Sequence, residues 1–286
     1  MVALLAALPI TQADTLYVSF QNSDTIRKYS PDGMGSFFAT TGLTNPNGLR
    51  ANPRGLAFDA AGNLYVANIS HNSVEKFTPA GVASLFSVVI VANCVAVDPL
   101  GNVFVSTDGD NRIYKITPGG VARVFTTTGL NNFWGLAFDV GGNLFAANCN
   151  NNTIMKFTPG GVGSVFASTG LSGPTGLAFD SKGNLYVANT DNNTIARFTP
   201  DGAGSLFAST GSSGAYGLAV DSADNLYAAV YDQHKIMKFT PDGVGSVFAS
   251  TGADAPTFLA VIPEPSALVL LTLGLLTLPA FCRQEV

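Results

Sequence analysis

Short apolar runs alternate with clusters of Gly, Asn, Asp, Ser and Pro along most of the chain. The runs have the length of β-strands rather than of helices. A repeat of about 40 residues that is built from strands predicts a β-propeller, in which each repeat forms one blade. Successive starts of the repeat lie 39, 41, 41, 41 and 41 residues apart. One run, GLAFD and its variants, begins at Gly55, Cys94, Gly135, Gly176, Gly217 and Phe258.

The fourth repeat shows the four strands that we expect in each blade. Its pattern predicts an inner strand over 176–180, a second over 185–189, a third over 194–198 and an outer strand over 204–210. The peptides DSKGN and TPDG between these strands are expected to be tight turns. In such turns Asp accepts hydrogen bonds from backbone amides, Pro presets φ, and Gly adopts the left-handed conformation.

The two ends of the chain hold complementary parts of one further blade. Five complete repeats fill 55–257, whereas 14–47 contains the last three strands of a unit and 258–262 contains a first strand alone. Joining these parts closes the ring and removes an open sheet edge, which would otherwise favour aggregation. We therefore predict an all-β fold over 14–262: a six-bladed propeller with four strands per blade, closed by the N-terminal strands and a C-terminal inner strand.

Two positions of the repeat keep their character in every blade. The second residue of each second strand is aromatic, and a basic residue stands near the end of each third strand. If the two strands form a short hairpin, these residues face each other and the basic stem lies on the ring, a contact of about 0.5–1 kcal/mol. We interpret the pairs as scaffolding rather than as a functional basic ring. They are Tyr17–Lys28, Tyr65–Lys76, Phe104–Lys115, Phe145–Lys156, Tyr186–Arg197 and Tyr227–Lys238.

Charge and cysteine content restrict the function classes. Charged residues make up 12% of the 286 residues, the net charge is −5, and no run of Lys or Arg is present. A nucleic-acid partner is not expected, because phosphate binding needs clustered positive charge. Cys94, Cys149 and Cys282 lack metal-ligand spacing; they can be idle thiols, or Cys94 and Cys149 can form a disulfide.

The first residues have the composition of an export signal. Residues 1–13 contain an apolar core followed by Thr11-Gln12-Ala13, a small-residue cleavage site. They lack a positively charged n-region. We interpret the segment as a signal peptide whose true start can lie upstream of Met1, and a buried first strand is the alternative.

The last residues, 263–286, resemble the PEP-CTERM sorting signal of bacterial envelope proteins. The motif PEPS precedes an apolar run over 267–282 and a single arginine, where the family usually has several. The run is shorter than the roughly 20 residues of a membrane-spanning helix, which favours a transient anchor. The resemblance implies recognition by an exosortase-type processing enzyme and contact with the membrane only through this tail. The residues of the signal are Pro263, Glu264, Pro265, Ser266 and Arg283.

The stretch NLYVANTDNNTIARF, residues 184–198, resembles the NHL repeat, and the resemblance covers nearly all of 14–262. It implies the propeller fold, but the family includes both enzymes and passive binding platforms, so it does not define an activity.

Enzymatic six-bladed relatives imply side chains that can be sought here. Gluconolactonase- and regucalcin-like propellers hold a divalent metal in the channel with Glu, Asn and Asp, but Glu75, Glu264 and Glu285 all lie outside the inner strands. Streptogramin lyase-like and amidating lyase-like propellers depend on histidines near the channel. His71 and His234 are expected in loops after second strands, further from the axis. We therefore predict no catalytic residue and no metal site.

Two further groups of polar residues have a structural explanation. The Asn-rich loops at 148–152 and 191–193 can bind calcium or sugar hydroxyls, but hydrated turns explain them better. Calcium is the one cofactor left open. A set of aspartates could suggest a ring of metal ligands, but each one opens a turn and is expected to cap it: Asp59, Asp98, Asp139, Asp180 and Asp221.

Departures from the repeat point to one candidate site. The residue just before each inner strand lies at the mouth of the central channel, where the chain has Arg54, Asn93, Trp134, Thr175, Tyr216 and Thr257. Trp134 is the only tryptophan. Aromatic rings beside Arg and Asn form a suitable site for a small organic or glycan ligand. We predict ligand binding by Arg54, Asn93, Trp134 and Tyr216, and the alternative is that Trp134 and Tyr216 only plug the channel.

These observations lead to one functional hypothesis and two alternatives. The hypothesis is an exported, non-enzymatic propeller of the cell envelope or extracellular matrix that binds an exopolysaccharide or an envelope protein. One alternative is a gluconolactonase-like or streptogramin lyase-like enzyme acting at the channel mouth. The other is a structural surface protein without a specific ligand.

Overall fold

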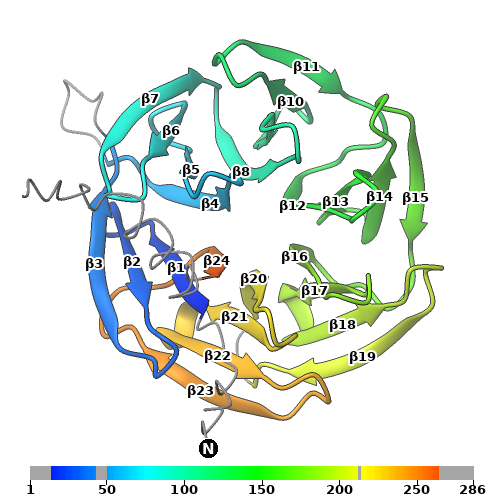
Figure 1. Ribbon diagram of the computed structural model, residues 1–286. Coiled ribbons are helices and arrows are strands. Elements are labelled where there is room, and N and C mark those ends of the chain that lie inside the picture. Colours follow the sequence, from blue (N-terminus) through cyan, green and yellow to red (C-terminus); the bar gives the residue numbers. More distant parts are fainter. Residues whose placement is uncertain (1–13, 43–49, 212–213, 264–286) are drawn as a thin grey trace, which may run out of the picture.

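The computed structural model is a disc of six four-stranded antiparallel sheets, and it describes residues 14–42, 50–211 and 214–263. Figure 1 looks along the axis of the disc, with the inner strands at the centre and the outer strands at the rim. The predicted six-bladed propeller is therefore confirmed. Among the described residues, no helix is long and apolar enough to span a membrane.

Each blade runs from an inner strand to an outer strand in chain order, except that blade 1 begins with the C-terminal strand. Blade 1 contains β24 (Leu259–Pro263), β1 (Asp14–Phe20), β2 (Thr25–Tyr29) and β3 (Gly35–Thr40). Blade 2 contains β4 (Pro53–Phe58), β5 (Leu64–Asn68), β6 (Ser73–Phe77) and β7 (Ala83–Val88). Blade 3 contains β8 (Ala92–Val97), β9 (Val103–Thr107), β10 (Ile113–Ile116) and β11 (Ala122–Thr126).

The other three blades repeat this order with short connections. Blade 4 contains β12 (Phe133–Phe138), β13 (Leu144–Asn148), β14 (Thr153–Phe157) and β15 (Gly163–Ala167). Blade 5 contains β16 (Pro174–Phe179), β17 (Leu185–Asn189), β18 (Thr194–Phe198) and β19 (Gly204–Ser209). Blade 6 contains β20 (Ala215–Val220), β21 (Leu226–Val230), β22 (Lys235–Phe239) and β23 (Gly245–Ser250). Two 3-10 turns, η1 (Thr190–Asn192) and η2 (Tyr231–Gln233), follow β17 and β21.

The ring closes within blade 1, as predicted from the two ends of the chain. β24 pairs with β1 in an antiparallel register that runs from Asp14–Pro263 to Val18–Leu259. The side chain of Ser19 adds to this junction, because its hydroxyl donates to the carbonyl of Arg54 at 2.7 Å and accepts the amide of Phe258 at 3.1 Å. The closure removes the edge that β1 would otherwise expose.

The core consists of six apolar clusters, each formed mainly by two neighbouring blades. Phe145 of blade 4, for example, packs with Leu177 and Leu185 of blade 5. A single blade would leave both faces uncovered, and its two neighbours of the same shape cover them, as blades 3 and 5 cover blade 4. This requirement explains why the apolar pattern recurs so regularly.

The six aromatic–basic pairs face each other in the register of the second and third strands, as predicted. Four lysines lie 5.0–5.2 Å from the partner's ring centroid, and Arg197 lies instead over Phe207. The same four lysines also approach the aspartate of their own blade, for example Lys156 to Asp139 at 3.6 Å. Each of these four lysines therefore links the turn aspartate of its blade to the aromatic residue of the second strand.

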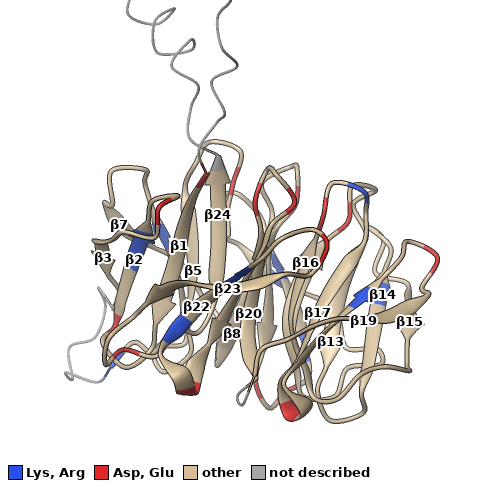
Figure 2. Cartoon of the chain, turned by 90° about the horizontal axis from the view of Figure 1, so that it is seen from below, with Lys and Arg blue, Asp and Glu red and all other residues tan. Residues whose placement is uncertain are grey.

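The repeated aspartates cap turns, as the sequence predicts. In blade 5, Oδ1 of Asp180 accepts the amides of Lys182 at 3.0 Å and Asn184 at 2.8 Å. Equivalent hydrogen bonds occur in the other complete repeats. Figure 2 shows acidic residues on turns at both faces of the disc. The five repeated carboxylates of Asp59, Asp98, Asp139, Asp180 and Asp221 are therefore occupied by backbone amides.

Glycines allow the inner strands to approach each other closely around the axis. A Cβ on Gly135 would lie 2.1 Å from the carbonyl oxygen of Thr175, and one on Gly176 would lie 2.4 Å from that of Tyr216. Both distances are far below van der Waals contact. Side chains at these positions would therefore force neighbouring blades apart.

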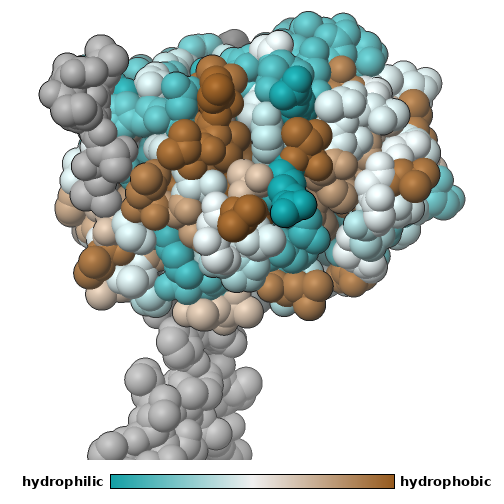
Figure 3. Space-filling view, turned by 90° about the horizontal axis from the view of Figure 1, so that it is seen from above, coloured by the Kyte–Doolittle hydropathy of each residue, from teal (hydrophilic) through white to brown (hydrophobic). Residues whose placement is uncertain are grey.

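Every outer strand at the rim carries an exposed apolar side chain at the same place in the repeat. Figure 3 shows such side chains separated by polar ones on one side of the disc. Isolated exposed apolar residues are ordinary on protein surfaces. The residues, which are 46–72% exposed, are Phe37, Leu85, Val124, Val165, Leu206 and Val247.

Candidate functional site

The candidate site lies at one mouth of the central channel. Because the first two strands of each blade are antiparallel, the start of the inner strand and the end of the second strand lie at the same face. Side chains from four blades meet there around a cavity of about 220 Å³, which we call the mouth pocket. It is lined by Gln21, Arg54, Trp134, Tyr216, Tyr231 and Thr257.

Three aromatic rings form one wall of the mouth pocket. The ring centroids of Trp134 and Tyr216 are 5.7 Å apart, and those of Tyr216 and Tyr231 are 5.4 Å apart. Nε2 of Gln21 donates to the hydroxyl of Tyr231 at 2.7 Å, which fixes the outer ring. Burial raises the pKa of Tyr216, so this phenol stays protonated at neutral pH.

Arg54 lies against this wall and is held from two sides. Its guanidinium carbon is 4.8 Å from the ring centroid of Trp134, and Nη1 donates to Oδ1 of Asn93 at 3.1 Å. Asn93 is fully buried, so it positions Arg54 rather than lining the pocket. Burial lowers the pKa of Arg54, and the charge of Asp108 partly opposes this effect. No described carboxylate lies within ion-pair distance of Arg54.

Several buried polar atoms at the mouth pocket have no hydrogen-bond partner among the described residues. They are Nε of Arg54, Nε1 of Trp134, Nδ2 of Asn93 and Oγ1 of Thr257. A buried polar atom without a partner costs about 1–3 kcal/mol, so such atoms are rare in folded proteins. Three of them, on Arg54, Trp134 and Thr257, belong to residues that line one cavity, which indicates a place where a ligand or water supplies missing partners.

Larger side chains fill the channel interior beyond the pocket. Where blades 2, 4, 5 and 6 have glycine at the start of the GLAFD motif, blades 3 and 1 have Cys94 and Phe258. Both side chains are at most 5% exposed and belong to the apolar cluster against which Trp134 packs. Burial raises the pKa of the Cys94 thiol to about 11. The pocket is therefore backed by packed apolar side chains, and Cys94 is not an activated thiol.

Sequence reasoning found most of this site but missed two members. Arg54, Trp134 and Tyr216 line the pocket as predicted, Asn93 supports it from within, and their role in binding stays a prediction. Gln21 and Tyr231 were missed. Each directly follows a second strand, so the antiparallel pairing that places the start of the inner strand at this face could have identified them.

Thr175 belongs to the same ring of residues but has a structural role. Its hydroxyl shares a hydrogen bond of 2.7 Å with that of Thr190 and donates to the carbonyl of Ala215 at 3.2 Å. Thr175 is 2% exposed and does not line the pocket.

The residues considered for enzyme chemistry do not line the mouth pocket. Glu75 is buried on β6, where both carboxylate oxygens accept the amide of Gly42 at 3.1 Å. His71 lies beside Gly42, and His234 ends the 3-10 turn η2. Cys94 and Cys149 are free thiols. The sorting-signal residues Glu264, Pro265, Ser266 and Arg283, and the side chain of Pro263, lie outside the described part of the structure.

The mouth pocket does not fit a divalent metal. Its unpartnered atoms are mainly hydrogen-bond donors and its charged group is a cation, whereas calcium and magnesium need oxygen lone pairs from carboxylates or carbonyls. No group of three or more His, Cys, Asp or Glu side chains with metal-binding geometry occurs in the described ranges. In the Asn-rich loop of blade 4, which was considered for calcium, Nδ2 of Asn148 donates to the carbonyl of Gly129 at 2.7 Å. This side chain therefore has a structural role in the loop.

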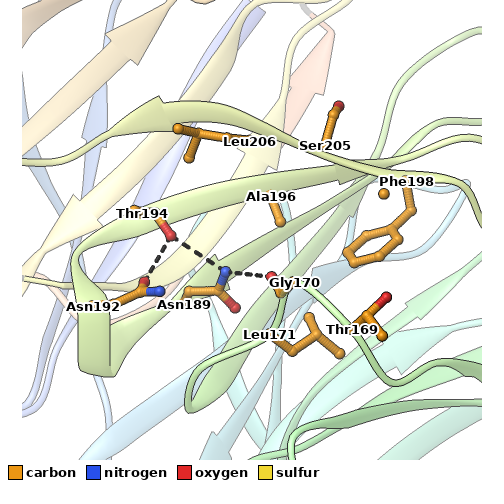
Figure 4. Close-up of a pocket in the computed structure, with 11 residues that line it drawn as sticks. Thr169, Gly170, Leu171, Asn189, Asn192, Thr194, Ala196, Phe198, Ser205 and Leu206 are labelled. Atoms are coloured by element: carbon orange, nitrogen blue, oxygen red, sulfur yellow. Dashed lines mark hydrogen bonds between the residues drawn. The ribbon is translucent and has the colours of Figure 1, made fainter.

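A second cavity lies at the rim between blades 4 and 5, with a volume of about 480 Å³. Figure 4 shows Thr194 and Asn189 on one side of it and Leu171 on the other. Ala196 lies in this cavity at the place where other blades have longer side chains, such as Met155 or Met237. The polar groups here already bond each other, since Nδ2 of Asn189 donates to the backbone carbonyl of Gly170 at 3.0 Å and to the hydroxyl of Thr194 at 3.3 Å. The mouth pocket is therefore the stronger candidate.

The fold and this site define a six-bladed propeller with an arginine and aromatic rings at one channel mouth. The chain belongs to the virginiamycin B lyase family, whose model matches residues 44–268. No curated protein sequence matches the chain.

Solved structures show the same fold at low sequence identity. A chain of a nidogen–laminin complex has a TM-score of 0.75 at 19% identity, covering 87% of this chain and 98% of that one. A catalytically inactive variant of virginiamycin B lyase from Staphylococcus aureus, with quinupristin, has a TM-score of 0.66 at 17% identity, covering 86% and 87%. A gluconolactonase from Xanthomonas campestris has a TM-score of 0.61 at 21% identity, covering 72% and 76%. The fold is therefore shared with binding proteins and with enzymes.

Proposed function

We propose that this protein is a non-enzymatic binding module whose mouth pocket holds a small organic ligand or the end of a glycan chain. The observation that carries the proposal is the set of three unpartnered buried polar atoms, on the lining residues Arg54, Trp134 and Thr257, beside three aromatic rings. Binding sites of small molecules combine apolar and aromatic walls with a few convergent polar groups. A volume of about 220 Å³ suits a single ring or a terminal group rather than a large molecule.

The lining residues support binding rather than proton transfer. A general acid or base needs a pKa near the working pH and a place beside the substrate. Arg54 and a half-buried, protonated Tyr216 do not meet this condition at neutral pH. The remaining lining residues include Gln21, Trp134 and Thr257, which recognise ligands by shape and hydrogen bonds.

Ligand screening tests the proposal. Trp134 is the only tryptophan, so its fluorescence reports on the mouth pocket directly. We expect at least one compound from a panel of monosaccharides and small aromatic acids and amides to change this fluorescence saturably and to raise the melting temperature. Trp134→Ala should abolish the shift in melting temperature. Leu206→Ala, at the rim cavity, is the matched control and should retain it.

A lyase-type or lactonase-type enzyme is the second candidate, and family membership favours it. Incubation with quinupristin or a gluconolactone, with and without Mg²⁺, distinguishes the two candidates by mass spectrometry of the products. Turnover that is lost in Trp134→Ala while the circular dichroism spectrum is unchanged would replace the binding proposal with the enzymatic one. Saturable binding without turnover supports the binding module.

Export and sorting form a separate part of the proposal and rest on the sequence of the two ends. We expect intact-mass analysis of protein from its native host, measured separately in the cell envelope and the medium, to show a chain that begins near Asp14 and ends near Pro263–Pro265. Such a chain would fit removal of a signal peptide and processing by an exosortase-type enzyme. A product that retains Ala267 to Val286 would contradict tail processing.

A further inference from the structure

Arg54 is a positive charge that makes no ion pair with a described carboxylate, in an acidic protein. The chain has a net charge of −5, yet Arg54 is the one charged residue that lines the mouth pocket. It makes no ion pair with a described carboxylate, and its burial lowers its pKa. Keeping a cation in such a place is costly without a counterion. A ligand with a negative charge removes that cost.

One edge of the Arg54 guanidinium lacks a protein partner at Nε. Nη1 is occupied by Asn93, whereas Nε has no partner. Nε and Nη2 together present two parallel N–H groups, the arrangement that binds the two oxygens of a carboxylate. Stacking of the guanidinium on Trp134 keeps this edge in a fixed orientation.

The other unpartnered atoms also require acceptors. Among the lining residues, Nε1 of Trp134 can only donate a hydrogen bond, and the hydroxyl of Thr257 can donate one. The neighbouring rings of Tyr216 and Tyr231 provide a flat surface for a ring-shaped body. The pocket thus combines an anion-binding edge with a stacking surface.

We infer that the mouth pocket recognises a carboxylate carried on a six-membered ring, with Arg54 binding the carboxylate and the tyrosines contacting the ring. The inference rests on the proposed binding function and names its ligand class. Two sources have this chemistry: an aromatic acid, and a uronic acid unit such as the end of an acidic polysaccharide.

Matched acids and amides test the inference with the full chain. Trp134 fluorescence is titrated with benzoate against benzamide, and with glucuronate against glucuronamide. Each amide has nearly the shape of its acid but lacks the charge. We expect at least one acid to bind about tenfold or more tightly than its amide, because charge-assisted hydrogen bonds are the stronger ones. The pair that shows the difference identifies the source.

Variants connect the effect to Arg54. Arg54→Gln should reduce the affinity for the acid about tenfold or more and bring it close to that of the amide. Arg54→Lys should restore the affinity only in part, because lysine cannot form two parallel hydrogen bonds to a carboxylate. Arg123→Gln is the charge-matched control, since Arg123 is exposed on the outer strand β11 and should leave binding unchanged. Circular dichroism melting checks that each variant folds.

The outcomes separate the inference from the proposed function. Equal affinity of acids and amides, or an acid preference that persists in Arg54→Gln, overturns the inference while the binding function stands. If none of the four probes binds saturably, the inference is also overturned. Binding of an uncharged compound from the wider panel would then still support the proposed function. If no compound of that panel binds either, the proposed function is also wrong.

Discussion

Gly135→Ala is expected to lower the free energy of unfolding by about 3 kcal/mol or more, which is the upper end of the usual cost of overpacking. The added Cβ would lie 2.1 Å from the carbonyl oxygen of Thr175, on the neighbouring inner strand β16. That atom belongs to the backbone, so it cannot move aside as a flexible side chain does. Blades 4 and 5 would have to separate, and urea denaturation followed by circular dichroism measures the loss.

Gly160→Ala is the matched control for this prediction. Gly160 lies in an exposed turn of blade 4, and the nearest atom to a Cβ there is Oγ1 of Thr158 at 3.9 Å. The change should leave the stability within about 0.5 kcal/mol or raise it slightly, because alanine reduces the entropy of the unfolded chain. A similar loss in both variants would show that close packing at the axis is not the cause. Trp134 directly precedes Gly135, so its fluorescence should shift in Gly135→Ala alone.

Removing β24 is expected to prevent the ring from closing. A chain of residues 14–257 loses the five register pairs between β24 and β1. It also loses Phe258, Leu259 and Ala260, which belong to three different inter-blade clusters. We expect a loss of more than about 5 kcal/mol, a large part of the 5–15 kcal/mol that stabilises a typical domain. The exposed edge of β1 should also cause association, visible by size-exclusion chromatography.

A chain of residues 14–263 is the control for the truncation, because it keeps β24. It should unfold cooperatively and elute as a compact species. If residues 14–257 unfolded at the same urea concentration as residues 14–263, ring closure by the two ends would contribute nothing to stability. Ser19→Ala offers a milder variant, since the Ser19 hydroxyl bonds both Arg54 and Phe258 across the junction.

The fold could be predicted because its determinants are local and repeated. Asp180 and Gly183 specify a turn whatever lies around them, and the short apolar run along 185–189 specifies a strand. Repetition then predicts the register, so that Tyr186 faces Arg197 in the structure as expected. The start of the inner strand was less predictable: β16 begins at Pro174, two residues before the predicted range, because its first residue pairs with Asn189 across a bulge.

The site was predictable only in part because it depends on contacts between blades. The position of Trp134 before an inner strand placed it at the channel mouth. The stacking of Arg54 on Trp134 and the hydrogen bond from Arg54 to Asn93 join blades 2, 3 and 4, and no local pattern encodes them. The cavity beside Ala196 likewise depends on how the outer strand β19 and the preceding loop pack around a short side chain.

The path of β24 through the disc determines how the protein can be presented. This strand starts next to Thr257 at the mouth pocket and ends at Pro263, which pairs with Asp14. Both ends of the propeller therefore leave from the face opposite the pocket, at the end of β24 that points upward in Figure 2. A tether joined to either end holds the disc by the face opposite the pocket. The tether can be a fusion partner, a surface linkage or an affinity tag. The pocket then faces outward, and the end of a long chain can reach it without meeting the support.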